Sequence, residues 1–188
     1  MVCNWDNGIG GVDRRTTHRV SISQGEYVVV DDPDTVITTV LGSCVAACIR
    51  DPKLGIGGMN HFVLPGPKSR VPLGGDVTRY GFYLMQSLVD HLVSKGANMR
   101  RLEAKVFGGA SPCNSYYNIG EQNAAYAIRF LAEKGINVVE SKFGGASGCK
   151  LEYWPVSGDV TYVQLMRSTP IKEPVINLKR VFPLRLAD

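Results

Sequence analysis

No stretch of this 188-residue chain approaches the ~20 consecutive apolar residues that a membrane-spanning helix requires, so we expect no membrane insertion. The chain has five cysteines, an odd number, and it lacks an apolar signal segment. Both features argue against a secreted framework of disulfides. We therefore expect a cytoplasmic protein whose thiols are reduced.

Nucleotide-binding motifs are also missing. Gly108-Gly109 and Gly144-Gly145 each follow an expected strand, yet neither pair belongs to a Walker motif with its lysine or to a full dinucleotide-binding pattern. We interpret both pairs as tight turns at the rim of a site. We expect no cofactor and no metal.

Charge is sparse and unevenly placed. Charged residues make up 20% of the chain and hydrophobic residues 44%, values typical of a globular protein. Residues 167–188 hold five basic and two acidic side chains, so this tail carries most of the net charge of +4. We interpret it as a solvated extension and expect no nucleic-acid partner. The chain should comprise a loosely ordered leader (1–23), a single domain (24–166) and a basic C-terminal extension (167–188).

Alternation of strand and helix patterns predicts an α/β fold. Apolar residues at helical spacing predict a helix over residues 80–95, and a capping box at Asn118 predicts a second one that ends at Gly135. Residues 65–79, rich in proline and glycine, read as a loop that forms a lid or rim. Strands are expected at residues 25–30, 35–40, from 102, 136–143, 149–154 and 159–166.

The most informative stretch is residues 41–65, LGSCVAACIRDPKLGIGGMNHFVLP, in which two β-prone runs flank a turn signal at residues 51–54. Pro52 favours a type I turn, which places the centre of the loop between residues 52 and 53. In that register Cys44 lies directly opposite His61, with Cβ atoms ~4.5–5.5 Å apart. A bulge at Gly57-Gly58 would spoil the pairing.

A thiol beside an imidazole can pass its proton to the ring and become a strong nucleophile. Three alternatives stay open. The cysteine and the histidine can be ordinary core residues, since free cysteine is among the most buried residue types. Cys44, Cys48 and His61 could bind a metal, provided that residues 44–48 are helical, because residues four apart on a strand lie ~13 Å apart. The chain could also be a non-enzymatic adaptor.

The motifs TVLGSCVAACIRDP and GIGGMNHFVLP, together with GEYVVV, TRYG, LEAKVFGGAS and NIGEQNAAYA, resemble the chemoreceptor glutamine deamidase family, CheD. The resemblance covers roughly residues 24–166. It implies that Cys44 is the nucleophile, His61 the general base and Thr38 the third catalytic residue. Ser43 and Asn60 are candidates for positioning the substrate or stabilising the oxyanion.

The resemblance also implies the fold and the partners. The fold would be a layered sandwich of mixed β-sheets with two main helices packed on the outside. The substrate would be glutamine side chains on the cytoplasmic helices of chemoreceptors, converted to glutamate through a thioester, and a CheC-type phosphatase would be a possible partner. One departure is Cys149-Lys150, near which the family usually has an arginine. It affects expected contacts with substrate or partner and leaves the catalytic residues unchanged.

Overall fold

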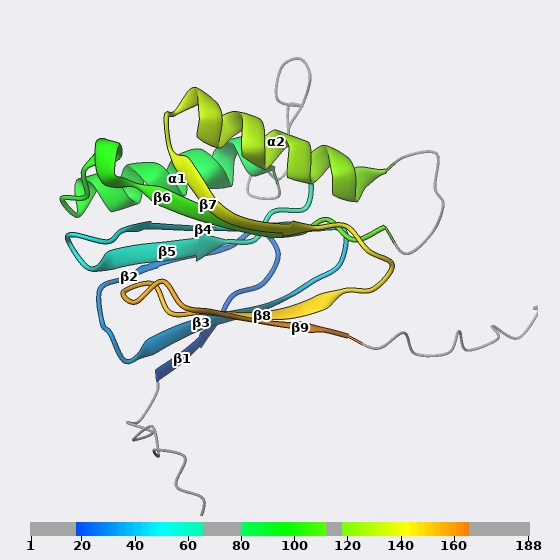
Figure 1. Ribbon diagram of the computed structural model, residues 1–188, viewed down its shortest axis with the longest axis horizontal. Coiled ribbons are helices and arrows are strands. Elements are labelled where there is room, and N and C mark those ends of the chain that lie inside the picture. Colours follow the sequence, from blue (N-terminus) through cyan, green and yellow to red (C-terminus); the bar gives the residue numbers. More distant parts are fainter. Residues whose placement is uncertain (1–17, 66–79, 112–117, 166–188) are drawn as a thin grey trace, which may run out of the picture.

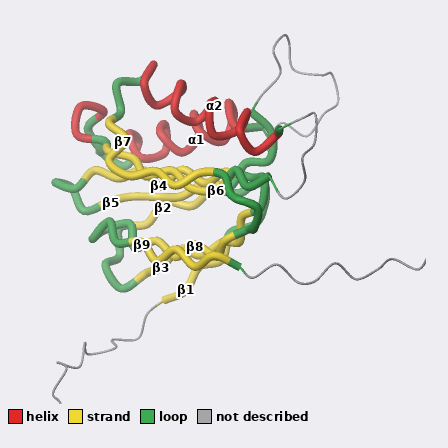
Figure 2. Tube along the Cα trace, turned by 45° about the vertical axis from the view of Figure 1, so that its right-hand side comes forward, coloured by secondary structure: helices red, strands yellow, loops and turns green. Residues whose placement is uncertain are grey.

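The computed structural model describes residues 18–65, 80–111 and 118–165. These residues form three stacked layers: a pair of helices, a five-stranded sheet and a four-stranded sheet (Figure 1). Both helices cover the same face of the larger sheet, and its other face packs against the smaller sheet (Figure 2). The predicted sandwich of mixed sheets with two outer helices is therefore confirmed. None of the helices in the described ranges is long and apolar enough to cross a membrane.

The five-stranded sheet has the order β2-β5-β4-β6-β7, and β6 and β7 run parallel while its other neighbours are antiparallel. The helix between β6 and β7 is the crossover that a parallel pair requires. Its elements are β2 (Tyr27–Val30), β4 (Val45–Asp51), β5 (Ile56–Asn60), β6 (Glu103–Gly108) and β7 (Asn137–Phe143). The helices are α1 (Gly81–Ser94) and α2 (Ile119–Glu133), and a 3-10 turn, η2 (Met99–Arg101), precedes β6.

The four-stranded sheet has the order β1-β3-β8-β9. Its strands are β1 (His18–Ser21), β3 (Thr35–Leu41), β8 (Cys149–Tyr153) and β9 (Val160–Gln164). The hairpin β8-β9 is the one expected around Gly158, which takes a φ of 81° in its turn. Residues 18–21 were expected in a loose leader, and this was wrong: they form a strand because β3 offers them a parallel edge. Residues 1–17 of the leader, the tail beyond residue 165 and residues 66–79 of the loop lie outside the described residues.

Two apolar cores follow from the alternation of side chains along the strands of the larger sheet. In β4, the odd-numbered residues from Val45 to Ile49 face the helices, and Ala46 and Cys48 face the smaller sheet. The predicted stripe of α1, buried as expected, completes the first core: Leu84, Met85, Leu88, Val89 and Leu92. β4 is buried on both faces. Cys44 and His61 both lie near its first residue, Val45.

The hairpin β4-β5 has a different register from the predicted one. Asp51 pairs with Ile56, so the loop contains residues 52–55 and not two residues. The N–H of Gly55 donates to the carbonyl oxygen of Asp51 at 3.0 Å, and Gly55 takes a φ of 72°, which favours glycine. A two-residue hairpin loop prefers positive φ at both positions, and Pro52 cannot adopt it. Each residue of β4 therefore pairs with a residue two positions further along the second strand than predicted, and the side chains keep their faces.

Asp51 is the anchor of this hairpin. Its carboxylate is fully buried and accepts three hydrogen bonds from the guanidinium of Arg101, the shortest at 2.6 Å. It also accepts backbone N–H groups from Lys53, Leu54 and Asn98 at 2.9–3.2 Å. The Arg101 bond lowers the pKa of Asp51 well below its usual range.

We expect Asp51→Ala to lower the free energy of unfolding by about 3 kcal/mol, because it leaves three backbone donors and a guanidinium without their acceptor. Urea unfolding monitored by circular dichroism measures this. Asp90→Ala is the control, since Asp90 is exposed on α1 and should change stability by less than ~0.5 kcal/mol. Equal effects of the two substitutions would contradict the anchoring role.

Candidate functional site

Cys44 lies just before β4, at the end of the turn that leaves β3. Its carbonyl oxygen accepts the N–H of Gly109 at 2.8 Å, and the carbonyl oxygen of Gly42 accepts the N–H of Ala110 at the same distance. A Cβ on Gly108 would lie 2.3 Å from the Cys44 carbonyl oxygen, so only glycine allows this approach. The glycine turn after β6 thereby holds the cysteine backbone, and 5% of Cys44 remains exposed.

His61 directly follows β5 and is held on its other side by the segment that leads into β2. Its N–H donates to the carbonyl oxygen of Glu26 at 3.0 Å, and its carbonyl oxygen accepts the N–H of Gly25 at 2.8 Å. Only 2% of the residue is exposed. The ring is therefore carried on a backbone that is paired on both flanks.

Cys44 and His61 share the face of the larger sheet that looks toward the smaller sheet. The pairing of Cys48 with Met59 continues without a slip to the bridge between Val45 and Phe62. His61 thus lies opposite Ala46, and Cys44 is its diagonal neighbour and not its direct partner. The Cα atoms of diagonal neighbours on adjacent strands lie roughly 7–8 Å apart, within the combined reach of a thiol and an imidazole. The prediction of a shared face holds, and the prediction of direct opposition was wrong.

A short relay of hydrogen bonds fixes the imidazole. Thr39 Oγ1 lies 2.8 Å from His61 Nδ1 and 2.8 Å from the carbonyl oxygen of Ile22. The carbonyl can only accept, so the hydroxyl proton goes to Ile22 and the hydroxyl oxygen accepts from Nδ1–H. We assign the tautomer on this ground: Nδ1 carries the proton and Nε2 carries the lone pair.

Burial sets the charge of the ring. Desolvation lowers the pKa of His61 to about 4, and the opposing attraction of Glu26 does not offset it. The imidazole is therefore neutral at pH 7. Nε2 is buried and has no hydrogen-bond partner among the described residues. A buried, unpartnered lone pair on the face that carries a thiol is suited to accept a proton from that thiol.

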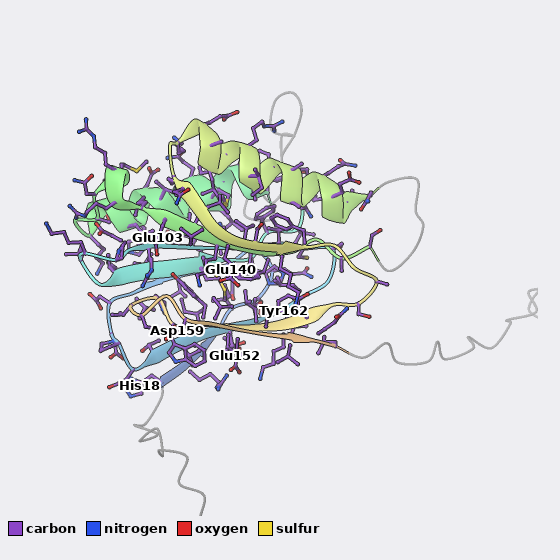
Figure 3. All side chains as sticks on the ribbon, viewed as in Figure 1. His18, Glu103, Glu140, Glu152, Asp159 and Tyr162 are labelled. Atoms are coloured by element: carbon purple, nitrogen blue, oxygen red, sulfur yellow. The ribbon has the colours of Figure 1, made fainter. Side chains whose placement is uncertain are left out.

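The threonine at the imidazole is Thr39, whereas the resemblance implied Thr38. Successive residues of a strand point to opposite faces, so Thr38 lies on the outer face of the small sheet, in register with Glu152 of β8. Figure 3 shows Glu152 on that outer side, away from the larger sheet. The structure therefore brings Thr39, Cys44 and His61 to one space between the sheets and places Thr38 outside it.

Ser43 and Asn60 were expected to position the substrate or the oxyanion. Asn60 is fully buried on the opposite face of β5, where its Oδ1 accepts the N–H of Ala47 at 3.0 Å and its Nδ2 donates to the sulfur of Met85 at 3.3 Å. These contacts bind β5 to β4 and α1. Ser43 directly precedes Cys44, and its carbonyl oxygen accepts a hydrogen bond from Asn123 of α2 at 3.0 Å.

The metal alternative required a helix at residues 44–48, and the structure contradicts this condition because residues 45–48 belong to strand β4. Cys48 is 1% exposed among apolar side chains, and desolvation raises the pKa of its thiol well above the usual range. Within the described ranges no three histidine, cysteine, aspartate or glutamate residues gather as metal ligands do. Cys44, Cys48 and Cys149 form no disulfide.

Two pockets are lined in part by residues that form hydrogen bonds with Cys44, Thr39 or His61. One of about 340 Å³ is lined in part by Ile22, Gly25 and Glu26, whose backbones contact Thr39 or His61. The other, of about 820 Å³, is lined mainly by α2 and by the glycine turns at Gly109 and Gly144. Volumes of this size accept a side chain or a segment of a bound protein.

Sequence reasoning missed Thr39 and Asn123. A signal for Thr39 was present, because Ile37, Thr39 and Leu41 have the parity of the inner face of β3. A signal for Asn123 was present as well, since it is the polar member of an otherwise apolar stripe on α2. What these two side chains contact could be learned only from the fold.

The comparisons with known proteins show the family of the chain. A family model described as CheD chemotactic sensory transduction matches residues 63–164. A relative from Rhizobium rhizogenes is 59% identical over 143 residues, which are 76% of this chain and 78% of the relative. A relative from Agrobacterium fabrum is 52% identical over 171 residues, which are 85% and 93% of the two chains. Both are named probable chemoreceptor glutamine deamidase CheD.

A more distant relative with the same name, from a Caulobacter species, is 47% identical over 168 residues, 85% of this chain and 89% of its own. Among solved structures, the hypothetical protein YfiH of Bacillus licheniformis matches with a TM-score of 0.44 at 13% identity. That match covers 69% of this chain and 61% of the other.

Proposed function

This chain belongs to the CheD family, and on that premise we propose that it deamidates selected glutamine side chains of chemoreceptors to glutamate, with Cys44 as nucleophile and His61 as general base. One observation carries the proposal. The neutral imidazole of His61 is oriented by Thr39 so that its lone pair at Nε2 lies on the face shared with Cys44.

The first half of the reaction forms a thioester. Nε2 of His61 takes the proton from Sγ of Cys44, and the sulfur attacks the carbonyl carbon of the glutamine side chain. When the tetrahedral intermediate collapses, the carbon–nitrogen bond breaks and the proton passes from Nε2 to the leaving nitrogen, which departs as ammonia. The side chain is then bound to Cys44 as a thioester.

The second half restores the enzyme. A water molecule gives a proton to Nε2 and attacks the thioester carbonyl, and the carbon–sulfur bond then breaks. The sulfur recovers its proton from His61, and the substrate leaves as glutamate. The negative oxygen that forms in each half needs hydrogen-bond donors, and we assign this part to the backbone at Ser43 and Cys44.

The contact between Thr39 and His61 supports a role in both halves. Each half places a positive charge on the imidazole for part of its course, and burial disfavours that charge. A fixed acceptor at Nδ1 keeps the ring in the tautomer that leaves Nε2 free to receive the proton. Thr39 therefore acts as a positioning residue.

The proposed partners follow from the same family. The substrate would be the cytoplasmic helical region of chemoreceptors, which places the protein in the cytoplasm, and a CheC-type phosphatase would be a binding partner. Co-purification with such a phosphatase from a host that encodes one would test the second point.

Mass spectrometry of a purified receptor fragment incubated with this protein tests the proposed activity. We expect the small mass gain of an amide-to-acid conversion at defined glutamines, accompanied by release of ammonia. If the wild-type protein binds receptors and changes none of them, the adaptor alternative replaces the enzyme.

Paired substitutions separate the two neighbouring threonines. Thr39→Val keeps the shape of the side chain but removes the acceptor for Nδ1–H, so we expect kcat to fall about 10–100-fold with a smaller change in KM. Thr38→Val, on the outer face, should reduce kcat by less than about threefold. Deamidation rates on one receptor fragment measure both. The reverse order would restore the assignment that the resemblance implied for Thr38.

A further inference from the structure

Asn123 is an unusual residue for its place. It lies on the face of α2 that packs onto the larger sheet, where its buried neighbours along the helix are apolar or glycine, and it is fully buried. A buried carboxamide costs free energy unless it is hydrogen-bonded. Its contacts should therefore show why an amide and not an aliphatic group occupies this position.

Both protons of the carboxamide are used. Nδ2 donates to the carbonyl oxygen of Ser43 at 3.0 Å and to the carbonyl oxygen of Val63 at 2.8 Å. Because both partners can only accept, the nitrogen and oxygen of this amide are assigned without ambiguity. Ser43 precedes Cys44, and Val63 follows His61 by two residues. One side chain therefore joins the backbone next to the nucleophile to the backbone next to the base.

This link lies where the strand ladder stops. Val45 of β4 exchanges two backbone hydrogen bonds, at 3.0 and 3.1 Å, with Phe62, which follows β5 by two residues, and this is the last pair before the site. Beyond them the chain bends away on both sides, and Leu64 pairs instead with Tyr80. Just beyond this last pair, the carboxamide of Asn123 joins the two chain segments through the carbonyl oxygens of Ser43 and Val63.

The position of α2 is itself set by a close contact. A Cβ on Gly120 would lie 2.3 Å from the carbonyl oxygen of Gly109, so the first turn of the helix packs directly on the glycine turn. The N–H of that same Gly109 donates to the carbonyl oxygen of Cys44. Asn123 lies three residues after Gly120, and its reach to Ser43 and Val63 depends on this packing.

The stability of the fold alone does not explain an amide at position 123. Its Oδ1 is buried and accepts no hydrogen bond from the described residues, which costs about 1–3 kcal/mol. An aliphatic side chain would avoid that cost but would supply no donor to Ser43 and Val63. The amide is therefore better explained by the geometry that its donors impose.

We infer that Asn123 is a positioning residue that holds Cys44 at the reacting distance from His61. The inference rests on the proposed cysteine-dependent reaction. A displacement of the order of 1 Å at a reacting centre can cost ~10²-fold in rate, so a single clamp has a measurable effect. Asn123 acts through the backbone and takes no part in proton transfer.

The test uses the full chain and two variants, Asn123→Ala and Asn123→Leu. Leucine branches at the same carbon and fills the space, so it keeps the helix packed if alanine does not. Ala127→Gly is the matched control, because Ala127 lies on the same buried face of α2 and glycine costs the helix ~1 kcal/mol. Two readouts are taken: deamidation of a receptor fragment, and the pH-dependent rate at which iodoacetamide alkylates Cys44, followed by peptide mass spectrometry.

For both Asn123 variants we expect kcat to fall about 10–100-fold while KM changes less than threefold. The alkylation rate of Cys44 at pH 7 should also fall about tenfold, because the thiol loses its alignment with Nε2. Ala127→Gly should leave both quantities within threefold despite a lowered unfolding midpoint.

Three results overturn the inference: no change in either Asn123 variant, equal losses in Ala127→Gly, or a fall in kcat with an unchanged alkylation profile. The alkylation readout needs no receptor. A wild type that fails to deamidate would therefore refute the proposed function and still leave the link between Asn123 and Cys44 measurable.

Discussion

Cys44→Ala should abolish deamidation of a receptor fragment, with a loss on the order of 10³-fold or more, because it removes the sulfur that forms the thioester. Cys44 lies directly before β4 and alanine keeps its Cβ, so removing the sulfur should leave the fold intact. Mass spectrometry of the fragment over time measures the loss. A circular dichroism spectrum and an unfolding curve establish that the variant is folded.

Cys48→Ala is the matched control for this experiment. Cys48 faces the smaller sheet, as Cys44 and Ala46 do, and it packs in the same apolar cluster. Its substitution removes a buried sulfur and lowers stability by about 1 kcal/mol, but it should keep kcat within about threefold. If Cys44→Ala retains wild-type deamidation, or if Cys48→Ala loses as much, the nucleophile has been assigned to the wrong residue.

His61→Asn should lower kcat by about 10²–10⁴-fold, since it removes the base and the acid of both half-reactions. Asparagine is smaller than histidine and can still donate toward Thr39, so the packing between the sheets changes little. The same fragment assay measures the rate. A residual activity above a tenth of wild type would contradict the role of His61 as general base.

The pH dependence gives a second signature of His61. The base must be neutral, and burial lowers its pKa to about 4, so kcat/KM of the wild type should fall as the pH drops through about 4. The remaining activity of His61→Asn should lack this limb. A profile that breaks instead near the ordinary histidine value of 6.5 would contradict a buried, neutral ring.

The same lowered pKa predicts how stability changes with pH. Between 6.5 and about 4 the unfolded chain binds a proton that the folded protein does not, so stability falls as the pH is lowered through this window. We expect the wild type to lose on the order of 2 kcal/mol more than His61→Asn between pH 7 and pH 5. Asp51 contributes in a lower window: its pKa is lowered, so its contribution is lost only below the ordinary carboxyl range.

Much of the local structure is present in the sequence. The stripe of α1, the asparagine that caps α2 and the turn at Gly158 are decided by residues within one or two turns of each other, and each lies where its pattern predicts. The chemistry of the site is local in the same sense. A cysteine after Gly42-Ser43 and a histidine after a short strand are recognisable without coordinates.

Non-local pairing decided the rest. β2 and β3 are neighbours in the chain, and strands were expected at both places, but β2 pairs with β5 and β3 with β8, in different sheets. The predicted register of β4 and β5 placed Cys44 directly opposite His61, and the four-residue loop that Gly55 allows changed the pair to diagonal neighbours. Such choices depend on the total burial of both faces, which no short window of sequence contains.

The sequence by itself determined that Cys44 and His61 would share one face at the ends of two neighbouring β-prone runs. Only the tertiary structure decided which side chains hold them. Moving one residue along a strand reverses the face, so Thr39 and not Thr38 reaches Nδ1 of His61. Asn123 reaches Ser43 and Val63 across 80 and 60 residues of chain, because the packing of Gly120 on Gly109 brings α2 against the end of the sheet.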